Sequence, residues 1–413
     1  MRLLLGFFFL AVLIYWHYKF AVLDSFKKYY FPVLIIKMSA GIGVGLIYLF
    51  YYKGGDTWTY FNQAILFKQV AFSSWVNFKG LFLFGNYELV PEFAFFNQPR
   101  AVFMVKLVAI VNLITNDNYW LTSAFFSFFS FLGIWRFATW AYQFFNLNKI
   151  ALFALVLWPS FLFWSSGVLK ESVAAGLIFW IIVEFFNLFE NKKSIIRVLG
   201  FILALYVLFL IKYYFAVVLI VTLIVFGIMK LIHVAHWKKR KQLLVWSLIL
   251  LIGLVIGGFL HPNLELNNIV SVIIINHDAF VGLSNTNNLI HFYPASSEWV
   301  WLLINTPKAL LAGLFLPLTF TSQNLFYSIA SIENWVLMVL VLRGVWNTKM
   351  KDIQSEFLLI LVSITYIGLL AIFLSLSTPN LGTLARYKVA YIPAFLVIIF
   401  ILNGFTRQQE RKL

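Results

Sequence analysis

A few ionisable side chains that could do chemistry lie at the predicted ends of long apolar runs. The chain has only 15 Asp and Glu among 413 residues, so an acidic residue in an apolar context stands out. A charged side chain near hydrocarbon is costly, and it usually faces a cavity and marks a functional site. Opposite charges that share such a cavity offset part of that cost. The residues in such places are Asp56, Lys170, Glu171, Lys212 and Arg386.

Asp56 has the chemistry of a general base. It follows two glycines in YYKGGDTWTYFNQA (51–64), where the backbone is free to turn. A lone carboxylate in such a place can accept a proton from an incoming hydroxyl. Trp58 and Tyr60 offer aromatic faces for a sugar or a lipid. Because an Asp there can equally cap an interfacial helix, the sequence leaves both roles open.

The basic residues have the chemistry of phosphate binding. Lys170 and Glu171 end PSFLFWSSGVLKES (159–172), where we expect a helix to begin and its N–H groups to favour an anion. Lys170 therefore needs a negative partner, either Glu171 or a phosphate. The fork of Arg386, next to Tyr387, can hold two phosphate oxygens. The alternatives are an interfacial ion pair for Lys170 and Glu171, and snorkelling anchors for Arg386 and Lys212.

Metal chemistry finds little support in the sequence. The segment 261–326 holds His261, His277, Asp278 and His291, but their spacing matches no metal-binding motif. We interpret them as loop residues, predict no metal site, and leave only a divalent metal open as a cofactor. The absence of cysteine excludes disulfides, thiolate metal sites and cysteine nucleophiles.

The composition is that of a membrane protein. Hydrophobic residues make up 62% of the chain, against roughly half in a soluble domain. The net charge of +16 falls in short clusters between apolar runs, such as ENKKSIIR (190–197) and HVAHWKKRKQ (233–242). Such clusters mark cytoplasmic loops, so the charge orients the chain in the membrane. It does not indicate nucleic acid, and neither a phosphate loop nor a dinucleotide fingerprint is present.

The apolar runs predict an all-α, polytopic bundle of about 11 transmembrane spans, with a range of 10–13. With eleven spans, the basic clusters, RGVWNTKMK (343–351) and the tail TRQQERKL are all cytoplasmic if 101–116 and 299–320 do not cross. We therefore expect these two segments to lie in the outer interface. The alternative is that both segments cross and one of the other spans is wrong. Arg136 and Glu184 fall inside spans and are expected to pair. The expected spans are 3–21, 32–51, 120–144, 150–166, 172–189, 196–211, 213–232, 243–260, 327–343, 355–375 and 387–404.

We expect residues 1–413 to form a single integral membrane domain. Its first outer loop, 53–119, carries interfacial helices, and its second outer loop is 261–326. Neither loop is long or polar enough to be a soluble domain. The first apolar run has no small-residue cleavage site and is interpreted as a retained span. No internal repeat is visible, which weakens a transporter interpretation.

The pattern resembles the GT-C superfamily, the multi-spanning glycosyltransferases that use polyprenyl-phosphate-linked sugars. The resemblance rests on Asp56 after a predicted span, on NQPRAVFMVKLVAIVNLIT (97–115) and on ARYKVAYIP (385–393). It implies Asp56 as the base, with Lys170 and Arg386 on the lipid phosphate. The chain departs from the superfamily in having GGDT in place of a paired acidic motif, and an extra first span. PSFLFWSSGVLKES also resembles a segment of polymerase-like proteins of surface-polysaccharide assembly.

The function expected on this basis is transfer of a hexosyl or pentosyl group from a polyprenyl-linked donor to a glycan, lipid or protein acceptor. The enzyme would be a multi-pass protein of the cytoplasmic membrane with an outward-facing active site. A polymerase or ligase of lipid-linked repeat units and a flippase or transporter are the alternatives, and an assembly partner in an envelope complex is another. The catalytic residue is Asp56. The predicted substrate-binding residues are Trp58, Tyr60, Lys170, Glu171, Lys212, Arg386 and Tyr387.

Overall fold

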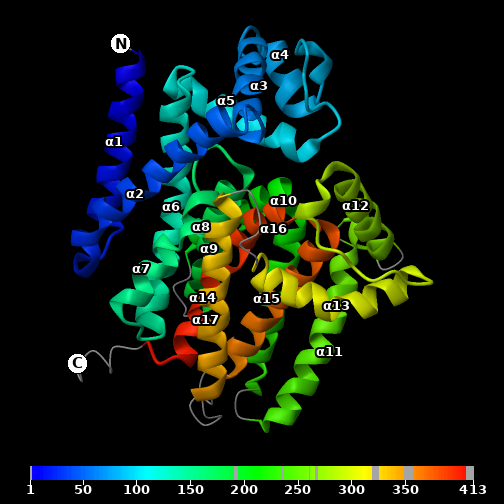
Figure 1. The fold of residues 1–413 in the computed structure, drawn as a ribbon. Helices are drawn as coiled ribbons and strands as arrows, with labels where there is room; N and C mark the ends of the chain where they lie inside the picture. Colours follow the sequence, from blue (N-terminus) through cyan, green and yellow to red (C-terminus); the bar gives the residue numbers. More distant parts are fainter. Residues whose placement is uncertain are drawn as a thin grey trace. The chain divides into compact units, whose positions relative to one another are not determined.

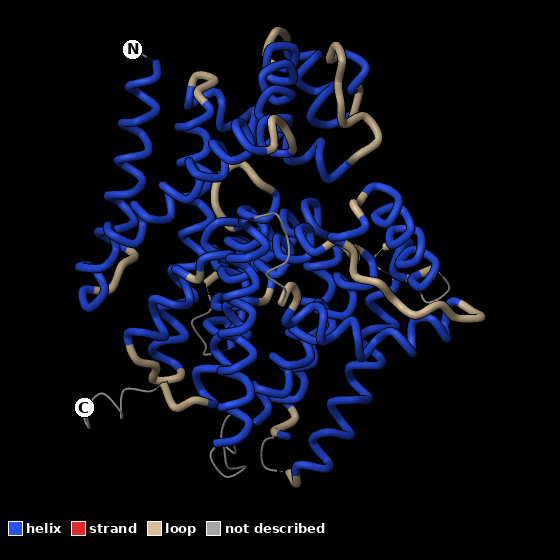
Figure 2. The backbone as a smooth tube through the Cα atoms, in the orientation of Figure 1, coloured by secondary structure: helices blue, strands red, loops and turns tan. Residues whose placement is uncertain are grey.

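The computed structural model describes residues 2–189, 194–234, 237–259, 261–265, 268–318, 325–347 and 357–405. Within these ranges every named element is a helix and no strand occurs (Figures 1 and 2). The all-α prediction is therefore confirmed for the described residues. The predicted cytoplasmic tail, 406–413, and parts of the three basic clusters lie outside them.

Contacts along the chain divide it into two compact units. Unit 1 comprises Met1–Trp140 and Val156–Tyr213, and unit 2 comprises Ala141–Leu155 and Tyr214–Leu413. Unit 1 contains α1 (Arg2–Phe20), α2 (Lys27–Leu46), α3 (Asp56–Ala71), α4 (Trp75–Lys79), α5 (Pro99–Thr115), α8 (Pro159–Trp164) and α9 (Lys170–Phe189). Unit 2 contains α11 (Lys239–Gly258), α12 (Ile269–Leu283), α13 (Glu298–Phe315), α14 (Leu325–Asn347), α15 (Phe357–Ser377), α16 (Leu381–Tyr387) and α17 (Ile392–Leu402). Residues of α6 (Tyr119–Phe144), α7 (Lys149–Leu157) and α10 (Ile195–Leu231) belong to both.

Eight helices of the described ranges are long and apolar enough to cross a membrane, and there are nine if one bent pair near the C-terminus counts as a single span. Membrane-spanning helices are thus supported, while the count of eleven stays a prediction. The eight are α1, α2 with its flanking turns (Asp24–Tyr51), α6, α9, α10, α11, α14 (from Tyr327) and α15.

The expected and observed spans differ where the backbone is interrupted. The run 150–166 is divided into α7 and α8, because Pro159 lacks the N–H that would continue the helix. The runs 196–211 and 213–232 form one helix, α10, in which Lys212 is non-helical (φ −148°, ψ 74°). The last run begins in α16, which is bent by 72° from α17. Neither α5 nor α13 is among the eight helices, and their interfacial position stays a prediction.

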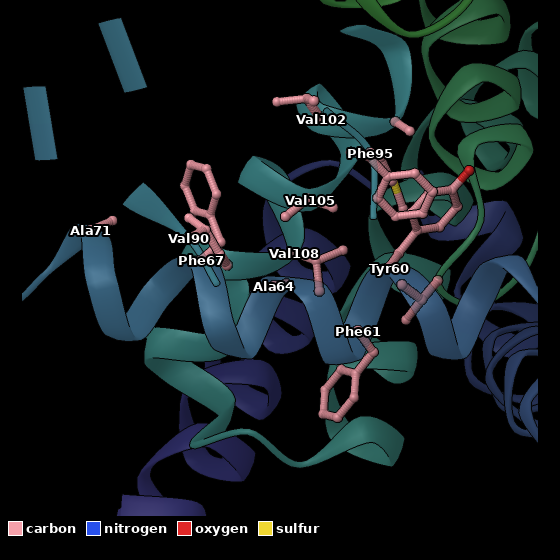
Figure 3. Close-up of a cluster of buried hydrophobic side chains, with 14 of the residues drawn as sticks. Tyr60, Phe61, Ala64, Phe67, Ala71, Val90, Phe95, Val102, Val105 and Val108 are labelled. Atoms are coloured by element: carbon pink, nitrogen blue, oxygen red, sulfur yellow. The ribbon is translucent and has the colours of Figure 1, made fainter. Parts of the chain in front are cut away.

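An apolar core holds α3 against α5 in unit 1. The buried apolar residues of α3 recur at helical spacing, at Tyr60, Ala64, Phe67 and Ala71, so they form one apolar face. Figure 3 shows this face beside α5, whose Val105 belongs to the same cluster. This packing fixes the first turn of α3, and with it Asp56, relative to the rest of the segment 53–119.

Lys106, also on α5, extends to the edge of this core. Its ammonium donates to the carbonyl of Phe82 at 3.0 Å and lies 5.3 Å from the ring centre of Tyr87. Burial lowers the pKa of Lys106 and raises that of Tyr87. The lysine thus ties the short helical turns after α4 to α5.

Candidate functional site

The candidate site of unit 1 is built on the break between α8 and α9. Pro159 opens α8, which ends after six residues, and Gly167 then adopts φ +73°, a conformation that glycine favours. A Cβ on Gly167 would lie only 3.1 Å from the carbonyl oxygen of Gly41 in α2. The backbone of this break therefore packs directly against α2. As a result, α9 begins at Lys170, as the sequence predicts.

Glu171 is held by a lysine from another backbone break. Its carboxylate lies 2.9 Å from the ammonium of Lys212, and the two side chains are 0% and 3% exposed. Lys212 is the one residue of α10 that leaves the helical conformation. The ion pair therefore joins the first turn of α9 to the kink of α10. Two predicted substrate-binding residues, far apart in the sequence, come together here.

Lys170 lies on the other side of the α9 terminus, against α3. Its ammonium lies 5.3 Å from the ring centre of Tyr60, a distance at which a cation is attracted to the face of an aromatic ring. Tyr60 itself is buried and packs against Phe95. This contact brings Tyr60 and Lys170 together, and their role in substrate binding stays a prediction.

Asp56 is the first residue of α3, one helical turn before Tyr60. Residues four apart share a helix face, so Asp56 stands on the side of α3 that also presents Tyr60. Gly55, at φ +112°, takes the N-cap position, so Asp56 itself is not the capping residue. The hydroxyl of Thr59 donates to the carbonyl of Gly55 at 3.0 Å. A carboxylate in the first turn is still favoured by the helix dipole, so the base and the helix-terminal roles both remain open.

Trp58 holds the start of α3 in place. Its indole N–H donates to the carbonyl of Gly45 at 3.0 Å, and its ring stacks on Tyr119 at 3.8 Å. The hydroxyl of Tyr119 also hydrogen-bonds to that of Thr57 at 2.6 Å. These contacts fix the turn that carries Asp56; the substrate contact predicted for Trp58 stays a prediction.

Arg100 is a cation that the sequence interpretation missed. It lies in the first turn of α5, and its guanidinium lies 5.6 Å from the ring centre of Tyr213, the neighbour of Lys212. Its segment, NQPRAVF, had been noted only as a predicted interfacial helix. The position directly after Pro99, which is favoured at a helix start, was the available signal. With Arg100, the first turns of α3, α5 and α9 carry two basic and two acidic side chains, and Lys212 at the kink of α10 adds a third cation.

An apolar groove of about 620 Å³ lies in unit 1 beside this site. Its walls come from α5, α6, α9 and α10, with Phe9 of α1. Gly133 and Gly176 form part of its lining, and a Cβ on Gly133 would meet the backbone of α9, so the two helices need glycine to approach this closely. Along α9 the groove runs from Val173, one turn after Lys170, to Trp180. A groove of this lining suits a hydrocarbon chain better than a polar ligand.

Arg386 and Tyr387 belong to unit 2. They end α16, where both side chains are partly buried, and the ring of Tyr387 lies 6.4 Å from that of Phe215. That they share a site with Lys170 stays a prediction. Among the described residues no three His, Asp or Glu side chains converge as metal ligands. His277 and Asp278, which the sequence suggested to be loop residues, lie in α12, where His277 hydrogen-bonds to the carbonyl of Leu376.

The expected pairing of Arg136 with Glu184 is confirmed, and Arg197 also contacts Glu184, at 3.7 Å.

Lys37 is a further residue that the sequence interpretation missed, since it lies inside an apolar run. It is fully buried in α2 and binds Ser165.

Comparison with known proteins adds no family to these observations: no protein-family model, no curated protein and no solved structure matches the chain.

Proposed function

We propose that this chain is a membrane glycosyltransferase. It transfers a sugar from a polyprenyl-phosphate or polyprenyl-diphosphate donor to a hydroxyl acceptor at the outer face of the cytoplasmic membrane. The observation that carries the proposal is the contact of Lys170 with Tyr60, one helical turn from Asp56. This contact places a cation beside an aromatic ring on the helix that begins with the Asp56 carboxylate, all within unit 1.

The proposed chemistry assigns each group one task. Asp56 takes the proton of the acceptor hydroxyl as its oxygen attacks the anomeric carbon of the donor sugar. The bond from that carbon to the phosphate oxygen breaks, and the lipid phosphate leaves with the electron pair. Lys170 and Arg100, with the N–H groups of the first turn of α9, stabilise the negative charge that develops on the leaving group.

The apolar groove supports a lipid-linked donor over a nucleotide sugar. A donor anchored by its phosphate near Lys170 has hydrocarbon-lined space one helical turn away, at Val173. A nucleotide sugar would leave this groove unused. The proposal includes the expected topology, in which α5 and α13 lie in the outer interface. In this topology the end of α9 that carries Lys170 faces outward.

The test is transfer of a labelled sugar from polyprenyl-linked donors by the purified protein in lipid, with Asp56→Asn as the variant. Removing a general base lowers the rate by about 10²–10⁴-fold, and donor binding should persist. Asp117→Asn is the matched control, since Asp117 lies in the same outer segment and pairs with Lys68 at 2.5 Å. Its transfer rate should stay close to that of the wild type.

Three outcomes would redirect the proposal. Full activity of Asp56→Asn would leave this residue a helix-terminal charge and refute its role as base. A product that grows by whole repeat units would favour a polymerase or ligase. Donor binding with lipid translocation but no transfer would favour a flippase.

A further inference from the structure

Lys37 is a charged side chain in the middle of a helix predicted to cross the membrane, and it is fully buried. Its ammonium donates to the carbonyl oxygen of Ser165 at 2.6 Å and to the hydroxyl of Ser165 at 2.5 Å. Among the described residues no carboxylate forms an ion pair with it. A lysine at such a depth is expensive, so its position needs a reason.

The reason lies in the backbone that Lys37 binds. Ser165 follows the last residue of α8, where carbonyl groups lack partners within the helix and the helix dipole favours a cation. No water is available at membrane depth, so a broken helix must have these groups satisfied from within the protein. Lys37 donates one hydrogen bond to the carbonyl of Ser165, and Ser130 donates a second to the same carbonyl at 2.8 Å.

The break that Lys37 holds sets the position of the proposed site. Lys170 follows Ser165 by only five residues, and those between them are buried. Ser127 accepts a hydrogen bond from the N–H of Gly167 at 2.9 Å, and Leu169 packs against Tyr48 beside the start of α3. A shift at Ser165 would therefore be carried to the first turn of α9.

Unit 2 contains the same arrangement at another helix end. The ammonium of Lys388, also buried, donates to the carbonyls of Leu314 and Leu316 at 3.1 and 2.8 Å, where α13 ends. Asn334 accepts a third hydrogen bond from it at 3.1 Å. A buried lysine thus holds a helix C-terminus in each unit, and the end held by Lys37, at Ser165, lies five residues before Lys170.

We infer that Lys37 is a positioning residue of the proposed site: its ammonium holds the end of α8 so that α9 begins with Lys170 against Tyr60. The role of Lys37 in donor binding rests on the proposed function, whereas its role in holding the end of α8 does not. Lys37 touches no reacting atom in this scheme. A substitution of Lys37 therefore affects donor binding through the position of Lys170.

Hydrogen exchange of the protein in lipid tests the backbone role, with Lys37→Met as the variant. The amides of 165–172 should exchange roughly tenfold faster or more, because local opening no longer costs the two hydrogen bonds of Lys37. Lys388→Met is the matched control: it makes the same chemical change at the buried lysine of unit 2 and should leave 165–172 protected. Lys37→Arg keeps a cationic donor and should restore most of the protection.

Steady-state kinetics tests the consequence for the site. In Lys37→Met the KM for a polyprenyl-phosphate donor should rise about tenfold while the acceptor KM stays unchanged, and Lys37→Arg should recover part of the difference. If Lys37→Met does not fold, Ser165→Ala removes one acceptor of the ammonium and should give an intermediate effect in both assays. Wild-type protection of 165–172 in Lys37→Met, or in Ser165→Ala where Lys37→Met does not fold, would overturn the inference. A wild-type protein without transfer activity would refute only the proposed function.

Discussion

Helix α9 carries a buried carboxylate near each end, and the two are neutralised in different ways. Glu171 and Glu184 are separated by about 20 Å along the helix axis. Glu171 pairs with Lys212, which is only 3% exposed. Glu184 pairs with Arg136 and Arg197, whose side chains are 33% and 41% exposed.

The difference separates two uses of a buried charge. Arg136 lies within α6 and Arg197 in the first turn of α10, away from its kink. Both keep part of their surface accessible, so their cost of burial is small and one can stand in for the other. The pair of Glu171 joins two backbone breaks and is sealed from solvent. Taking both charges out of water costs several kcal/mol per ion, which their attraction repays only in good geometry. We interpret the Glu184 cluster as structural and the Glu171 pair as part of the site.

The largest effect is expected for Lys212→Met. Glu171 would keep its burial and lose its ion-pair partner, which typically destabilises a protein by about 3–5 kcal/mol. Chemical or thermal unfolding in a mild detergent measures this loss. The double variant Glu171→Gln, Lys212→Met removes both charges and should recover much of the stability. A double variant as unstable as the single one would show that the kink of α10 needs Lys212 for another reason.

A smaller effect is expected for Arg136→Met. The change removes a charged hydrogen bond to Glu184 and the contact of the guanidinium with Trp180 at 5.2 Å, while Arg197 still balances the carboxylate. The expected loss is about 1.5–3 kcal/mol, measured by the same unfolding experiment. Donor KM should not change, since this cluster lies at the far end of α9 from Lys170. A rise in donor KM in Arg136→Met would remove the distinction between the two carboxylates.

The sequence predicted part of this arrangement and missed the rest for a physical reason. Arg136 and Glu184 were expected to pair because both lie inside apolar runs, where a charge needs a partner. For Glu171 the sequence offered only its neighbour Lys170 as a partner, while the structure brings in Lys212 from another helix. Apolar periodicity indicates that a helix exists, but it does not say which helices face each other.

The helix breaks also divide into those that the sequence predicted and those that it missed. The break before α8 can be predicted from Pro159 alone, because a proline interrupts a helix through its own missing N–H. The sequence also marked Lys212, but as a loop between two spans, whereas the helix continues on both sides of it. Lys37 gave no local signal at all: its role depends on Ser165, 128 residues away, which only the packing of α2 against α8 brings close.

The smallest effect is expected for Arg197→Gln. The guanidinium of Arg197 is 41% exposed and lies 3.7 Å from the Glu184 carboxylate, while Arg136 is in direct contact with the same group. Exposed ion pairs contribute about 0–1 kcal/mol, so the unfolding midpoint should barely move. The combined variant Arg136→Met, Arg197→Gln should then cost more than the sum of its parts, because the second change leaves Glu184 buried without either arginine. Simple additivity would show that the two arginines do not substitute for each other, and the contrast with Glu171 would lose its basis.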